Sequence, residues 1–184
     1  MKNNVMDKTS PEYLVKQVAG SRSSLLMVLI FTVVNLVMLL LDSGSYFLFS
    51  ASVPYYLTAF GIGMDMGMGV EGIGTFTMVG LGVSAVALVW YLLCWLLSKK
   101  RSGWLVAALV AFILDTAALV LICLAFDMLT DSIMDLVFHA WVVWVLIQGI
   151  AAGKKLKNLP AEALNPETEE PAAAPVDPWD RPEA

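Results

Sequence analysis

The sequence predicts an all-α integral membrane protein: a four-helix transmembrane bundle with an external interfacial or re-entrant segment and a disordered C-terminal tail. Three observations predict this fold class. Hydrophobic residues make up 59% of the 184 residues, whereas a soluble domain is nearer half apolar. Four apolar runs are long enough to cross about 30 Å of hydrocarbon as helices. The lysines and arginines are clustered beside these runs rather than spread through the chain.

The predicted spans follow in chain order. Helices are the required form, because backbone groups that face lipid must be satisfied within their own segment. We expect residues 1–23 to form a cytoplasmic N-terminal amphipathic lead-in and residues 24–157 to form the membrane domain. The predicted spans cover residues 25–41, 76–97, 104–126 and 132–152, and an external loop covers residues 42–75.

The lead-in carries the signs of a helix start. Ser10 can accept a hydrogen bond from the first turn, Pro11 suits the first helical position, and Glu12 lies beside the positive end of the helix dipole. Such a helix would lie on the membrane surface before the first span. A cleaved signal peptide is a less favoured alternative, because the leader is long.

The basic clusters predict the orientation of the spans. One precedes the first span, one follows the second and one follows the fourth. Because cytoplasmic loops carry an excess of Lys and Arg, we expect both termini in the cytoplasm and a multi-pass protein of the cell (inner or plasma) membrane. The clusters are Lys2, Lys8, Lys16 and Arg22; Lys99, Lys100 and Arg101; and Lys154, Lys155 and Lys157.

A fifth apolar run, residues 46–63, tests this orientation. Counting it as a span would place the second basic cluster outside and the others inside, against the orientation rule. The run also contains serine, proline and tyrosine, a composition typical of an interface. We therefore assign it to the external loop as an interfacial helix or a re-entrant element, with a five-span arrangement as the alternative.

The C-terminal tail, residues 158–184, has seven acidic residues against a single arginine and is rich in Pro and Ala. It cannot bury enough apolar surface to offset the entropy of ordering, so we expect it to be disordered in the cytoplasm. Trp179 offers a contact for a cytoplasmic partner, although a purely solubilising tail is the simpler alternative. No basic patch with interleaved aromatics supports a nucleic-acid partner.

Four polar residues fall at similar depths in the four predicted spans. Asn35, Ser84, Asp115 and His139 lie about 16 to 20 Å from the basic ends of their helices. Asp115 carries an insertion cost of about 2.5 to 3.5 kcal/mol, so it should face the bundle interior and find a partner. If it pairs with His139, the two could share a proton and act as a relay. The alternative is a protonated aspartate that joins helices.

Two groups suggest a metal site, and each has a simpler alternative. Asp135 and His139 share a helix face, but a zinc site needs at least three protein ligands and the chain has one histidine. Met64, Met66 and Met68 are soft thioether ligands that suit Cu(I), but they also fit an apolar loop on the membrane surface. We therefore predict no cofactor.

Small residues spaced four apart let helices approach closely, within one chain or between copies. Gly80 with Ser84, and Ala107 with Ala111, form such pairs. Besides the lipid bilayer, a homo-oligomer or a larger membrane complex is therefore an expected partner.

The function classes narrow to two. No nucleophile-base set, Walker loop or zinc-hydrolase signature occurs, so we do not expect an enzyme. We favour a non-catalytic accessory or assembly subunit of a membrane complex. The alternative is a small transporter or permeation protein, for protons or a small solute, with a polar site around Asp115 and His139. Copper handling through the three methionines is less favoured. Convergence of the four polar residues on one place would favour transport.

Overall fold

The structure, a computed structural model, describes residues 10–44 and 46–160. This part of the chain is all-helical and has no strand, which confirms the all-α part of the predicted class. Four of its helices, α1, α3, α4 and α5, are long and apolar enough to cross a membrane. The predicted tail lies outside the described residues from residue 161 onward. The helices are α1 (Pro11–Leu40), α2 (Ser52–Gly67), α3 (Thr75–Leu97), α4 (Gly103–Ala125) and α5 (Ile133–Lys157).

The predicted lead-in and first span form one continuous helix, α1, rather than two elements. The Ser10 side chain caps it by accepting a hydrogen bond from the Tyr13 N–H at 3.3 Å. The polar residues between lead-in and span do not interrupt the helix, because their hydroxyls find carbonyl partners. Ser21 donates to the carbonyl of Gln17 at 3.1 Å or of Val145 at 2.7 Å. The separate lead-in element is therefore a correction to the sequence-based expectation.

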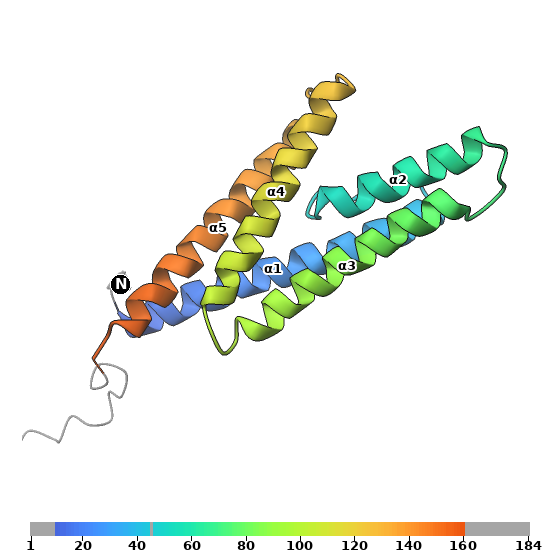
Figure 1. Cartoon of the computed structure of the whole chain (residues 1–184). Helices are drawn as coiled ribbons and strands as arrows, with labels where there is room; N and C mark the ends of the chain where they lie inside the picture. The colour runs from blue at the N-terminus through green and yellow to red at the C-terminus, as the bar shows by residue number, and fades with distance from the viewer. Residues whose placement is uncertain (1–9, 45, 161–184) are drawn as a thin grey trace, which may run out of the picture.

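Charge separates the two ends of the bundle. The start of α1, the α3–α4 connection and the end of α5 lie together at one end (Figure 1), and all described lysines and arginines are there. We call this the basic end. The other end, formed by the end of α1 and the α2–α3 and α4–α5 connections, is the acidic end. Its acidic residues are Asp42, Asp65, Glu71, Asp127, Asp131 and Asp135.

Two helical hairpins are joined through α1. In one, α2 packs along α3, and in the other α4 packs along α5, while α1 contacts both α3 and α5. The hairpins diverge toward the acidic end (Figure 1). Gly61 and Gly80 permit the close approach of α2 to α3. A Cβ atom on Gly61 would lie 2.5 Å from the carbonyl oxygen of Phe76, and one on Gly80 would lie 2.7 Å from that of Leu57.

The chain folds back into the bundle before α2 begins. After α1 ends, the chain turns back along it, so that Phe47 lies beside Asn35 and Ala51 lies beside Thr32, one turn deeper. At 1.5 Å per residue, Thr32 is about 12 Å inside the acidic end of α1. From that depth α2 returns to the acidic end, and its 16 residues are too few for a span. We call the irregular residues 46–51 together with α2 the re-entrant segment.

The apolar core lies where α1, α3, α4 and α5 meet. Its fully buried members include Leu25, Phe112, Val142 and Leu146. The outer surface is also apolar, and many of its large side chains are well exposed, such as Val86 at 71% and Leu121 at 67%. A continuous apolar exterior of this kind suits helices whose surroundings are lipid rather than water.

A candidate proton-sharing site at the start of the re-entrant helix

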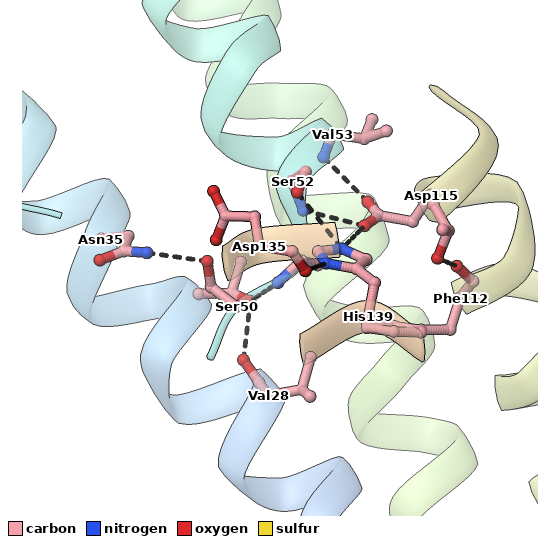
Figure 2. Close-up of polar contacts among 12 residues, drawn as sticks. Val28, Asn35, Ser50, Ser52, Val53, Phe112, Asp115, Asp135 and His139 are labelled. Atoms are coloured by element: carbon pink, nitrogen blue, oxygen red, sulfur yellow. Dashed lines mark hydrogen bonds and ion pairs between the residues drawn. The ribbon is translucent and has the colours of Figure 1, made fainter. Parts of the chain in front are cut away.

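The first turn of α2 lies buried inside the bundle and needs hydrogen-bond acceptors, because the first N–H groups of a helix have no partner within it. No side chain of α2 itself caps it. Asp115, from α4, supplies both acceptors. Its Oδ2 accepts from the Ser52 N–H at 2.9 Å, and its Oδ1 accepts from the Val53 N–H at 2.8 Å (Figure 2). A carboxylate at this place also faces the positive end of the helix dipole.

His139, from α5, completes the site. Its Nε2 lies 3.1 Å from Oδ2 of Asp115 and 3.3 Å from Oγ of Ser52. On the opposite side of the ring, Nδ1 lies 2.8 Å from the backbone carbonyl oxygen of Asp135. The imidazole is fully buried and stacks on Phe112, with ring centroids 4.9 Å apart. The ring is therefore held on both edges and on one face.

These contacts restrict where the protons lie. A carbonyl oxygen can only accept, so Nδ1 of His139 carries a hydrogen and donates it to Asp135. A hydrogen bond across the 3.1 Å contact between Nε2 and Oδ2 of Asp115 requires a further proton on one of these two atoms. The site is either an imidazolium beside a carboxylate or an imidazole beside a carboxylic acid. The two forms differ only in the position of a single proton.

Asn35, from α1, hydrogen-bonds the irregular residues that precede α2 in the re-entrant segment. Its Oδ1 accepts from the Phe47 N–H at 2.8 Å, and its Nδ2 donates to the Phe47 carbonyl at 2.7 Å and to Ser50 Oγ at 2.8 Å. One turn away, Thr32 Oγ1 accepts from the Ala51 N–H at 2.8 Å. Side chains of α1 thus satisfy backbone groups of the irregular residues before α2, which have no partners in a helix.

Ser84, from α3, holds α2 itself. Its hydroxyl lies 2.8 Å from the Pro54 carbonyl oxygen and 3.1 Å from Oγ1 of Thr58. Asn35, Ser84, Asp115 and His139 therefore all contact the re-entrant segment, and each comes from a different long helix. The structure brings Asp115 and His139 into direct contact, whereas Asn35 and Ser84 bind other parts of the same segment.

The sequence-based reading missed Thr32, Ser50, Ser52 and Thr58, which are buried and hydrogen-bonded to this arrangement. A signal for Ser50 and Ser52 was present. Ser50, Ser52 and Pro54 interrupt an apolar run, and polar residues with a proline mark irregular backbone and a helix start. Thr32 offered no such signal, because a threonine within an apolar helix commonly bonds its own helix, as it also does here to the Val28 carbonyl at 2.7 Å.

The residues considered for metal binding do not converge. Both ring nitrogens of His139 are engaged, and the described residues hold no group of three or more His, Cys, Asp or Glu side chains that could bind a metal ion. Met64, Met66 and Met68 are 39%, 69% and 57% exposed at the end of α2. Because residues two apart point to opposite sides of a helix, Met64 and Met66 do not share a face.

Both small-residue pairs lie at contacts within the chain. Gly80 and Ser84 face α2, as the close approach to Leu57 and the hydrogen bond to Pro54 show. Ala107 and Ala111 pack against the apolar core.

Two open cavities meet at the first turn of α2. One, of about 470 Å³, lies between α2 and α4 toward the acidic end, and its wall includes Tyr56, Phe60 and Phe126. The other, of about 380 Å³, lies between α3 and α4, and Asp115 is part of its wall. Val53 lines both cavities. The turn that Asp115 caps thus separates them.

No family model, curated protein or solved structure matches this chain.

Proposed function

We propose that this chain is a small proton-coupled permeation protein whose gate is the first turn of α2. The observation that carries the proposal is that one carboxylate has two tasks. Asp115 caps the buried start of α2 with both oxygens, and its Oδ2 also lies 3.1 Å from Nε2 of His139. The charge on Asp115 therefore links proton uptake to the position of the re-entrant segment.

Adding a proton weakens the cap. An ionised carboxylate makes charge-assisted hydrogen bonds to backbone N–H groups and interacts favourably with the helix dipole. When His139 and Asp115 are both protonated, Nε2–H and the carboxyl O–H become competing donors across the 3.1 Å contact. The pair then separates, and the Ser52 and Val53 amides lose their charged acceptor. Uptake of a second proton thus favours release of the turn.

Release of this turn would join the two cavities, because Val53 lines both and follows the capped amides. The lining is almost entirely apolar, with Asp115 as its acidic member. A species that moves with the proton would therefore be small and largely apolar, with at most one group able to hydrogen-bond Asp115. An ion that keeps its hydration shell does not fit such a lining.

The accessory-subunit function is the competing proposal. The observed contacts support it less, because both small-residue pairs lie at contacts within the chain and not on a free surface for a partner. Its strongest support is that Asp115 also serves as a structural link between α4, α2 and α5. Proton flux measured in liposomes separates the two proposals.

The test uses the purified protein in liposomes that enclose a pH-sensitive dye, with a pH gradient imposed across the vesicle membrane. We expect the wild type to dissipate the gradient faster than empty vesicles. Asp115→Asn and His139→Gln should abolish the difference, because neither can pass on the shared proton. Asp65→Asn is the matched control, since Asp65 is another buried aspartate that caps a helix start but has no histidine beside it.

Infrared spectroscopy gives the second readout. The carboxyl band of Asp115, identified by its loss in Asp115→Asn, should change with pH and should move when His139 is replaced by Gln. A wild type that is no faster than Asp115→Asn, together with a carboxyl band insensitive to His139, would refute the proposal. Loss of folding or oligomer in Asp115→Asn, without any proton flux in the wild type, would favour the accessory subunit.

A further inference from the structure

The basic end gathers cations from three separate parts of the chain. Within residues 10–24, 95–105 and 150–160 there are eight lysines and arginines and one acidic residue, Glu12. The fold brings these segments together. Arg22 of α1 hydrogen-bonds Ser98 after α3, and Gly153 of α5 lies against Ser102 in the α3–α4 connection. The charges therefore act on one small region.

Arg22 is held in a defined position inside this region. Its Nε donates to Ser98 Oγ at 3.0 Å, and its Nη2 donates to the Trp95 carbonyl at 3.4 Å. The guanidinium also lies over the Trp95 ring, 5.8 Å from the centroid. These two hydrogen bonds use two of its five N–H donors. No carboxylate among the described residues forms an ion pair with Arg22.

Arg22 also lines a small cavity. This cavity has a volume of about 190 Å³ and combines two cations, Arg22 and Lys99, with the hydroxyl-bearing Ser98. The rest of its wall is apolar and comes from α1 and α5, with Val18 and Leu156 among its members. The cavity wall thus combines charged hydrogen-bond donors with hydrocarbon.

We propose that this cavity binds the headgroup of an anionic phospholipid. The lipid phosphate would accept hydrogen bonds from the free Arg22 donors and from Lys99, and an acyl chain would lie along Val15 and Val18. Arginine suits this role because its planar fork matches phosphate oxygens, and basic pockets at helix ends recognise such headgroups. The apolar wall distinguishes a lipid from free phosphate. The proposal does not depend on the proton-coupled function.

The test compares the full-length protein in phosphatidylcholine nanodiscs with and without phosphatidylglycerol. We expect phosphatidylglycerol to raise the thermal unfolding midpoint of the wild type, and native mass spectrometry to retain bound anionic lipid. The double variant Arg22→Gln/Lys99→Gln should bind this lipid about tenfold more weakly. Lys100→Gln/Arg101→Gln removes the same charge beside the cavity without altering its lining and should bind like the wild type. Arg22→Lys/Lys99→Arg keeps the charge and should retain binding better than the double Gln variant, and circular dichroism of each variant checks its helical fold.

Three results would overturn the proposal. Equal weakening in both double variants would mean that the whole basic end acts as a diffuse field. Equal stabilisation by inorganic phosphate would mean that no lipid is recognised. Binding that appears only after removal of residues 161–184 would mean that the acidic tail, rather than a lipid, is the anion for this cavity.

Discussion

Two buried aspartates perform the same structural task in different surroundings. Asp65 is 1% exposed and caps the start of α3, where it accepts from the Phe76 N–H at 3.2 Å, the Thr77 N–H at 2.8 Å and the Thr77 hydroxyl at 2.7 Å. Asp115 is 5% exposed and caps the start of α2. Each reaches from one helix to satisfy the first amides of another.

The difference lies in the neighbours that can change protonation. Burial alone would raise the pKa of Asp65, but hydrogen bonds from Thr77 and Phe76 outweigh burial and lower the pKa below its ordinary value. These donors are permanent, so Asp65 stays ionised and serves as an anchor. Asp115 has His139 at 3.1 Å, and that neighbour can give or take a proton. The two caps thus use the same backbone contacts, and they differ in whether a histidine side chain contacts the carboxyl group.

The largest expected effect is the loss of the Asp115 cap. Asp115→Ala leaves the Ser52 and Val53 amides and His139 without their partner inside the bundle. Breaking a buried pair in this way costs about 3 to 5 kcal/mol, and unfolding in a denaturing detergent followed by circular dichroism would measure it. Asp65→Ala should cause a smaller loss, because it leaves no buried histidine without its partner. An equal or larger loss in Asp65→Ala would break the comparison.

The next effect isolates the Asp65 cap. A Cβ atom on Gly74 would collide with the carboxyl group of Asp65, so Gly74→Ala should displace that group from the α3 amides. We expect Gly74→Ala to lower the unfolding midpoint about as much as Asp65→Ala, with no further loss when the two changes are combined. Gly82→Ala, where a Cβ atom would meet nothing within 4 Å, is the control and should stabilise α3 by about 1 kcal/mol. Additive losses in the double variant would contradict this account.

The smallest effect is the pH dependence of the anchor. Because the pKa of Asp65 is lower in the folded chain, its stabilisation is fully present above the ordinary aspartate pKa of about 3.9 and is lost as pH falls through the folded pKa. The difference in unfolding midpoint between wild type and Asp65→Asn should therefore stay constant near neutral pH and shrink only in acid. A difference that already disappears near neutral pH would show that Asp65 is not the permanent anchor described here.

The sequence predicted the long helices well, because their length, hydropathy and flanking charges are properties of each segment. It also identified Asn35, Ser84, Asp115 and His139 as polar residues at similar depth. It treated lead-in and first span as separate, although Ser21 and its neighbours remain helical by bonding to carbonyls. It left open whether residues 46–63 lie at the interface or re-enter the bundle, because an apolar run with serines and a proline fits both.

What the sequence by itself determined is the all-helical architecture, the four long apolar helices, the separation of charge between the two ends of the bundle, and four of the buried polar side chains. Only the tertiary structure decided what those side chains bind. The partners of Asn35 and Asp115 are backbone groups of Phe47, Ser52 and Val53. Backbone amides are the same in every residue except proline, so no residue pattern indicates which of them an aspartate will cap. That choice depends on where the returning chain lies in space.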